Sequence, residues 1–181
     1  MREKIRKPAV FLDRDGVLAK EKSYVISVKD LEIFPYAAEC VRKIHEKGYY
    51  AIVVTNQSGV ARGMFTEEEL QKMNDCLIKE TGVDGVYYCP HHPEGKVKEY
   101  RKKCSCRKPG RGMFDAAGKD FDIDMQRSWM IGDQAGDIRA GKNLGFRTVL
   151  LESGYGTAGL EEETEPDYIL NDLRNVLEVL E

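Results

Sequence analysis

Short apolar runs alternate with amphipathic segments along the whole chain, which is the pattern of β-strands connected by crossover helices. The apolar runs predict strands at residues 9–12, 50–55, 85–89, 128–131, 147–151 and 168–170. The helical periodicity predicts helices at residues 35–47, from residue 66 onward, and at 112–119, 135–144 and 173–180. We therefore expect a single α/β domain, residues 1–181, in which a mainly parallel sheet is covered by helices on both faces.

Two of the predicted helices also carry end signals. Pro35 stands at an early helical position and Gly48 follows the last periodic residue of the first helix. In the second helix, Thr66 and Glu69 have the spacing of a capping box, in which the threonine hydroxyl accepts a bond from a backbone N–H group. These signals predict three of the helix boundaries independently of the apolar pattern.

Composition and charge narrow the class of protein. The chain has 181 residues and a formal net charge of −3, with charged residues mixed along most of its length, so nothing global favours nucleic acid or an anionic membrane as a partner. The charged N-terminus MREKIRKPAV is followed by no signal-like apolar region, and no run approaches the roughly 20 apolar residues of a membrane span. We expect a cytoplasmic monomer whose five cysteines are reduced.

Unusual polar residues follow several of the predicted strands. Asp13 and Asp15 come directly after the first strand, Thr55 and the NQSG segment follow the second, and residues 132–137 (GDQAGD) follow the fourth. In an open parallel sheet the ligand site lies at the carboxyl ends of the strands. We therefore expect these segments to converge, although they are far apart in the sequence.

The residue types in these segments suit phosphoryl transfer. Two neighbouring carboxylates repel each other, and a divalent cation offsets this repulsion; with Asp133 they make a plausible oxygen-rich Mg²⁺ site. Lys108 can neutralise phosphoryl oxygens, and the Thr55 hydroxyl can donate a hydrogen bond to them. A carboxylate nucleophile, a metal, a lysine and a neighbouring acid are the parts that an aspartyl-phosphate mechanism requires.

A purely structural explanation competes for the two aspartates. Asp13 and Asp15 could each cap a turn, and for either residue alone we would favour that interpretation. Turn capping does not require Lys108 and Asp133 as well. The full set therefore favours a catalytic site.

A second cluster of chemically distinctive residues lies between the third strand and Lys108. Cys89-x-His91 and Cys104-x-Cys106 together offer three thiolates and one imidazole, the donor set of a closed tetrahedral Zn²⁺ site. His92 is an adjacent competitor for His91, and it could equally be a surface residue. We expect a zinc loop at residues 89–109 that stiffens the segment carrying Lys108, without binding substrate.

The same loop is locally basic, which leaves a second function class open. Its cationic residues are Lys96, Lys98, Arg101, Lys102, Lys103, Arg107, Lys108 and Arg111. A non-catalytic zinc module that binds nucleic acid through this loop is the alternative, although it leaves the paired aspartates, Thr55 and Asp133 unexplained. Arg107 adjoins Lys108 and can clamp an anion with two hydrogen bonds, so we assign it to the site.

In order and spacing, these motifs resemble the four motifs of the haloacid-dehalogenase-like (HAD-like) phosphatases: Asp13-x-Asp15, Thr55, Lys108 and Gly132-Asp133-xxx-Asp137. The resemblance implies a three-layer, Rossmann-like fold. It implies Asp13 as the nucleophile, Asp15 as general acid and then base, and Thr55 and Lys108 as the groups that hold the phosphoryl group.

The same resemblance implies a ligand set for the metal. Mg²⁺ would be bound by Asp13, the main-chain carbonyl of Asp15, and Asp133. Asp137 would position Lys108 or a metal-bound water. The interval between Asp13 and Thr55 is largely used by the first helix and second strand, so we expect no large cap domain and an open site suited to a small phosphate ester.

The segments CPHHP, CSCRKP, FLDRDG and TNQSGVARG resemble a narrower family, the D-glycero-D-manno-heptose 1,7-bisphosphate 7-phosphatases. The related histidinol-phosphate phosphatases usually have a shorter zinc loop, so histidinol phosphate or another small phosphomonoester is the alternative substrate. The resemblance implies substrate contacts from Glu21, Lys22, Ser23, Tyr24, Asn56, Gln57, Ser58 and Arg107. Gln134 stands where some heptose enzymes have lysine, and this position bears on specificity more than on chemistry.

Overall fold

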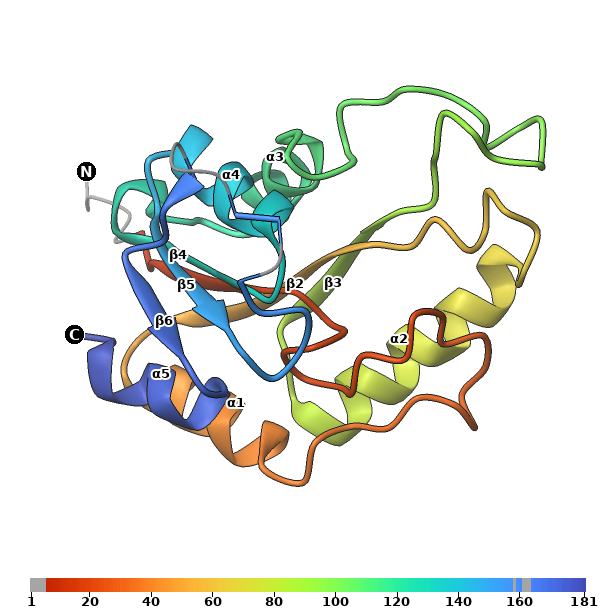
Figure 1. The fold of residues 1–181 in the computed structure, drawn as a ribbon. Helices are drawn as coiled ribbons and strands as arrows, with labels where there is room; N and C mark the ends of the chain where they lie inside the picture. Colours follow the sequence, from red (N-terminus) through yellow and green to blue (C-terminus); the bar gives the residue numbers. More distant parts are fainter. Residues whose placement is uncertain (1–5, 158, 161–163) are drawn as a thin grey trace.

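The computed structural model describes residues 6–157, 159–160 and 164–181; residues 1–5 of the predicted domain lie outside the described part. Its centre is a six-stranded sheet in the order β3-β2-β1-β4-β5-β6, and every neighbouring pair is parallel (Figure 1). The strands are β1 (Ala9–Leu12), β2 (Tyr50–Asn56), β3 (Gly85–Cys89), β4 (Trp129–Gly132), β5 (Arg147–Leu151) and β6 (Tyr168–Leu170). The prediction of an α/β fold with a parallel sheet is confirmed.

The helices lie close to their predicted positions. They are α1 (Ala37–Glu46), α2 (Glu67–Thr81), α3 (Gly112–Asp120), α4 (Ala135–Asn143) and α5 (Leu173–Val179). At the start of α2 the Thr66 hydroxyl accepts a hydrogen bond from the Glu69 N–H at 3.2 Å, as the capping signal predicts. A short 3₁₀ helix, Met125–Arg127, was not predicted, because three residues are too few to show a periodicity.

Helices cover both faces of the sheet, which gives three layers (Figure 1). Alternate residues of β1 show the division: Val10 and Leu12 pack in the core on the side of α1 and α5, whereas Ala9 and Phe11 pack on the side of α3. Phe11 is fully buried and contacts Phe114 of α3 edge-on, with ring centroids 5.0 Å apart. Burial of one such side chain contributes on the order of 2 kcal/mol, so the two cores hold β1 rigidly in the centre.

The order of the strands places a topological switch point between β1 and β4. From β1 the chain proceeds outward through β2 and β3, then returns to β4 on the other side of β1 and proceeds through β5 to β6. A crevice opens at the carboxyl ends of the strands where the direction reverses. The aspartates that follow β1 and β4 stand at this point.

No large additional domain interrupts the described chain between β1 and β2, where residues 13–36 form irregular backbone that leads into α1. This agrees with the prediction that a large cap is missing. Within the described part of the chain, every helix falls short of the length and apolarity that crossing a membrane requires.

Candidate active site

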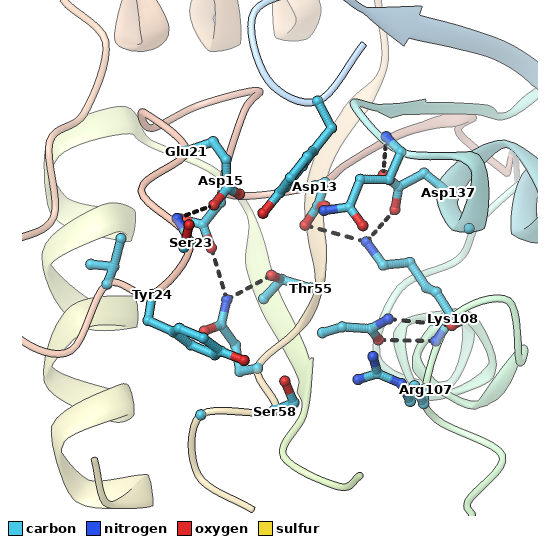
Figure 2. A pocket seen from close by; sticks show the side chains of 17 residues that line it. Asp13, Asp15, Glu21, Ser23, Tyr24, Thr55, Ser58, Arg107, Lys108 and Asp137 are labelled. Carbon is cyan, nitrogen blue, oxygen red and sulfur yellow. Dashed lines mark hydrogen bonds and ion pairs between the residues drawn. The ribbon is translucent and has the colours of Figure 1, made fainter. Parts of the chain in front are cut away.

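A cavity of about 230 Å³ lies at the carboxyl ends of β1, β2 and β4 (Figure 2). Most of the residues expected to serve catalysis or substrate binding line it: Asp13, Asp15, Glu21, Ser23, Tyr24, Thr55, Asn56, Gln57, Ser58, Arg107, Lys108, Gln134 and Asp137. The segments that follow four different strands therefore converge, as the parallel-sheet argument anticipates. Figure 2 shows Glu21, Asp15 and Ser23 on one side of the cavity and Lys108 and Arg107 on the other.

Lys108 is buried in the wall of this cavity and makes three polar contacts. Its Nζ donates to the Val54 carbonyl at 2.7 Å, and it lies 3.2 Å from Asp13 Oδ1 and 2.6 Å from Asp137 Oδ1. A buried ammonium is stable only when its charge is balanced and its donors are satisfied, and these contacts provide both. Lys108 thereby fixes one oxygen of Asp13 and leaves its other oxygen, Oδ2, outside this ion pair.

Asp133 occupies a tight cradle next to Asp13. A Cβ atom at Gly16 or Gly154 would lie 2.3 Å or 2.0 Å from Asp133 Oδ2, so both positions require glycine. Asp133 Oδ2 accepts a hydrogen bond from the Tyr155 N–H at 3.0 Å. Asp133 Oδ1 is buried and has no hydrogen-bond partner among the described residues, which leaves one carboxylate oxygen unsatisfied.

The carboxylates shift one another's titration. Burial raises the pKa of Asp13 to about 7, with the nearby Asp137 and Asp15 charges adding to the shift and Lys108 opposing it. Burial, together with the charges of Asp13 and Asp137, raises the pKa of Asp133 to about 8. The single positive charge of Lys108 is therefore too small to neutralise these carboxylates. A divalent cation would supply the missing positive charge.

The donor set fits such an ion. Ligand oxygens of Asp13, Asp133 and Asp137 lie within 4.8 Å of one another. Asp137 is already engaged: Oδ1 binds Lys108, and Oδ2 accepts from the N–H groups of Asp133 and Gln134. Asp13 and Asp133 therefore have oxygens to offer a hard cation such as Mg²⁺, whereas Asp137 holds Lys108 and the start of α4 in place.

Asp15 belongs to a separate network on the other side of Asp13. The Arg14 guanidinium, fully buried, donates to both Asp15 oxygens at 3.0 and 2.8 Å. Gln57 Nε2 donates to Asp15 Oδ2 at 3.1 Å and to Thr55 Oγ1 at 2.9 Å. Because Thr55 accepts from Gln57, its own hydroxyl hydrogen remains available for a bound anion.

Several residues of the expected substrate set have other partners. Asn56 donates to the Lys108 carbonyl at 3.3 Å and accepts from the Lys108 N–H at 2.9 Å, so its amide fixes the lysine backbone. Gln57 holds Asp15 and Thr55, as described above. Lys22 donates to the Asp30 carbonyl at 3.0 Å and pairs with Glu32 at 3.2 Å. These three side chains therefore position other groups in this structure.

The remaining residues expected to bind substrate also belong to the cavity lining. Ser58 and Gln134 line the cavity, and so do Glu21, Ser23 and Tyr24 of the loop after β1. Arg107 Nη1 is buried and has no hydrogen-bond partner among the described residues. An unpaired guanidinium nitrogen beside Lys108 is suited to bind a phosphate oxygen.

The cysteine segment gathers as its spacing indicates. Cys89, His91, Cys104 and Cys106 form a four-residue cluster whose ligand atoms lie within 4.8 Å of one another. The Sγ atoms of Cys89 and Cys106 are 2.9 Å apart, and His91 Nδ1 is 3.3 Å from Cys106 Sγ. Burial and the neighbouring Cys106 thiol raise the pKa of Cys89, so a cation is required if all three are to be thiolates. The geometry and donor types fit Zn²⁺.

Tyr88 at the end of β3 and Tyr100 of the zinc loop both bind α2. Tyr88 and Tyr100 donate their hydroxyl hydrogens to the two carboxylate oxygens of Glu67, at 2.9 and 2.7 Å. The Tyr100 ring centroid lies 6.3 Å from that of His91. The cluster therefore has a fixed base, and the chain leaving it at Cys106 passes directly into Arg107 and Lys108.

Sequence reasoning missed three contributors to the site: Arg14, Tyr155 and Gly154. The segment SGYG begins two residues after the end of β5 at the carboxyl edge of the sheet, and this position was the one signal that could have identified Tyr155. Arg14 lies between the two motif aspartates, but a single sequence does not show whether its side chain points inward. Its burial is visible only in the structure.

Comparison with known proteins places the chain among phosphatases. Residues 105–176 match a family model described as HAD-hydrolase-like. Over 174 residues the chain is 42% identical to a D-glycero-beta-D-manno-heptose-1,7-bisphosphate 7-phosphatase of Haemophilus ducreyi, covering 92% of this chain and 94% of that protein. It is 39% identical over 180 residues to a D-glycero-alpha-D-manno-heptose-1,7-bisphosphate 7-phosphatase of Photorhabdus laumondii, covering 94% and 95%.

A solved structure shows the same likeness in three dimensions. The D,D-heptose 1,7-bisphosphate phosphatase from B. bronchiseptica, complexed with magnesium and phosphate, superposes with a TM-score of 0.78 at 29% identity. The match covers 96% of this chain and 97% of that one. The similarity therefore includes the sheet and the segments that surround the cavity.

We expect Asp133→Asn to raise the melting temperature in magnesium-free buffer by more at pH 8 than at pH 5. Since burial raises the pKa of Asp133 from 3.8 to about 8, its contribution to stability is full below pH 3.8 and is lost as the pH rises toward 8. Asparagine carries no charge at either pH. Thermal unfolding by circular dichroism measures the two shifts, and equal shifts at both pH values would contradict the electrostatic account.

Cys106→Ser should lose the metal of the cysteine cluster, because a serine hydroxyl is a poor ligand for Zn²⁺ at neutral pH. Metal content by mass spectrometry should fall from one zinc per chain to near zero, and the melting temperature should fall with it. Cys76→Ser, a half-buried cysteine outside the cluster, is the matched control and should keep its zinc. Unchanged zinc in Cys106→Ser would refute the ligand assignment.

Proposed function

Because the chain belongs to the family of the heptose-1,7-bisphosphate 7-phosphatases, we propose that Asp13 carries out removal of the 7-phosphate from D-glycero-D-manno-heptose 1,7-bisphosphate. The chain is a phosphoric monoester hydrolase of the HAD type. The observation that carries the substrate assignment is the sequence similarity to enzymes named for that reaction, which extends over nearly the whole chain at 39–42% identity. The residue roles rest on the geometry of the cavity.

In the first step, an oxygen of Asp13 attacks phosphorus in line with the bond to the sugar oxygen. The contact of Lys108 with Asp13 Oδ1 leaves Oδ2 less engaged, so we assign the attack to Oδ2, and Oδ1 would be the Asp13 oxygen that contacts the metal ion. Lys108 and the Thr55 hydroxyl stabilise charge on the transferring phosphoryl group. Asp15 gives a proton to the leaving sugar oxygen, so the alcohol departs and the phosphoryl group is bonded to Asp13.

In the second step, water hydrolyses this acyl phosphate. Asp15, now deprotonated, accepts a proton from the water as its oxygen bonds to phosphorus, and the bond from phosphorus to Asp13 breaks. Inorganic phosphate forms and the Asp13 carboxylate is regenerated. The hydrogen bonds from Arg14 and Gln57 to Asp15 support this role, because they hold the carboxylate at the cavity wall.

Asp13, the Asp15 main-chain carbonyl and Asp133 would hold Mg²⁺. When bound, this ion supplies positive charge that offsets the acidic cluster and polarises a phosphoryl oxygen. The unsatisfied Asp133 Oδ1 supports this assignment. A structural Zn²⁺ would be held by the cluster of Cys89, His91, Cys104 and Cys106. It would fix the segment that carries Arg107 and Lys108.

The sugar and its second phosphate would contact the rest of the cavity lining. Arg107 and Ser58 are the groups suited to the second phosphate, and Glu21, Ser23, Tyr24 and Gln134 are suited to the sugar. Histidinol phosphate is a weaker candidate because the chain's full-length similarity is to heptose enzymes. We also infer that the enzyme works as a cytoplasmic monomer, with a small phosphorylated sugar and no nucleic acid as its partner.

Asp13→Asn should lower kcat by at least about 10³-fold, because the amide is a far weaker nucleophile than a carboxylate. The substitution preserves size, and Lys108 keeps its ion pair with Asp137, so the melting temperature should stay within a few degrees of the wild type. Asp75→Asn, on the exposed face of α2, is the matched control and should keep full activity. Appreciable turnover by Asp13→Asn would exclude a covalent mechanism through this residue.

The substrate is tested by phosphate release with Mg²⁺ from both anomers of heptose 1,7-bisphosphate, with fructose 1,6-bisphosphate and histidinol phosphate in parallel. We expect one heptose anomer to have a kcat/KM higher than either comparison substrate by orders of magnitude. The relatives carry both alpha and beta names, so both anomers are required. Equal and poor rates on all four would contradict the heptose assignment.

A further inference from the structure

The segment after β5 is fixed to the catalytic centre at two points. Ser153 Oγ donates to the Gly16 carbonyl at 2.6 Å, and the Tyr155 N–H donates to Asp133 Oδ2 at 3.0 Å. Gly154, between them, packs so closely on Asp133 that a side chain there would collide with the carboxylate. The backbone at Tyr155 is therefore held in one place relative to the reacting groups.

The Tyr155 side chain extends from this fixed backbone along the cavity wall. It lines the cavity and is 49% exposed, so its ring is accessible to a ligand. Glu21 and Ser23, which belong to the loop after β1, line the same cavity, and the Glu21 charge raises the pKa of the Tyr155 hydroxyl. Tyr155 thus shares one side of the cavity with a loop that is far away in the sequence.

The side of the cavity that carries Tyr155 differs in charge from the side that carries Lys108. Lys108 and Arg107 offer positive charge, whereas Glu21, Ser23 and Tyr155 offer a carboxylate and two hydroxyl groups (Figure 2 labels all of these but Tyr155). A phosphate group would be repelled by Glu21. The hydroxyl groups of a sugar would instead find both donors and acceptors there, and an aromatic face against which to pack.

We propose that Tyr155 is a specificity-determining residue, whose hydroxyl, together with Glu21, binds a hydroxyl group of the sugar next to the transferred phosphate. This inference rests on the proposed function, since it assumes a polyhydroxylated substrate. Tyr155 has no part in bond breaking. It distinguishes a sugar phosphate from a phosphate ester that lacks hydroxyl groups at this position.

The test compares Tyr155→Phe with the wild type on two substrates, the preferred anomer of heptose 1,7-bisphosphate and p-nitrophenyl phosphate. The substitution removes the hydroxyl but keeps the ring and the N–H group that binds Asp133. The ratio of kcat/KM for heptose bisphosphate to that for p-nitrophenyl phosphate should fall about tenfold, the usual effect of one lost hydrogen bond. Tyr168→Phe, on the edge strand β6, is the matched control and should leave the ratio unchanged.

The possible outcomes separate the two hypotheses. If Tyr155→Phe lowers both kcat/KM values equally, the residue acts on Asp133 rather than on the sugar, and the inference is wrong. An unchanged ratio with unchanged rates also overturns it. A wild-type enzyme that does not prefer either heptose anomer to p-nitrophenyl phosphate overturns the proposed substrate, and the role of Tyr155 with it.

Discussion

The ion pair between Lys108 and the carboxylates of Asp13 and Asp137 is the interaction on which the site depends. It joins a residue from the loop before α3 to residues that follow β1 and β4, so it requires the whole sheet to be assembled. Breaking one partner of a buried pair leaves an uncompensated charge and costs several kcal/mol. The same pair engages Oδ1 of Asp13 and leaves Oδ2 outside it, which is the basis for proposing Oδ2 as the attacking atom.

The position of Lys108 is fixed from several directions. The Asn56 amide forms hydrogen bonds with both the carbonyl and the N–H group of Lys108, and the Val54 carbonyl accepts from the lysine ammonium. The cysteine cluster anchors the chain just before Lys108. In the proposed mechanism, much of the loop at residues 89–109 therefore serves to position Lys108. A loop alone would place a flexible lysine poorly, because each ordered rotamer costs conformational entropy.

The sequence allowed the strands, the helices and the convergence of the strand-end residues to be predicted, because apolar periodicity and parallel topology together determine which edge carries the site. It did not reveal that Asn56 and Gln57 bind protein groups, since an amide can serve a ligand or a neighbour equally well. It also did not reveal the cradle of Asp133. That cradle arises where Gly16 and Gly154 meet, and contacts between loops so distant in the chain leave no periodic signal.

The stereochemical course at phosphorus tests the central claim most directly. Hydrolysis in isotopically labelled water of a substrate whose phosphoryl group is chiral through oxygen isotopes and sulfur shows whether displacement occurs once or twice. Attack by Asp13 followed by attack of water inverts the configuration twice, so the account predicts net retention. Net inversion would mean that water attacks the substrate directly, and the role assigned to Asp13 would be wrong.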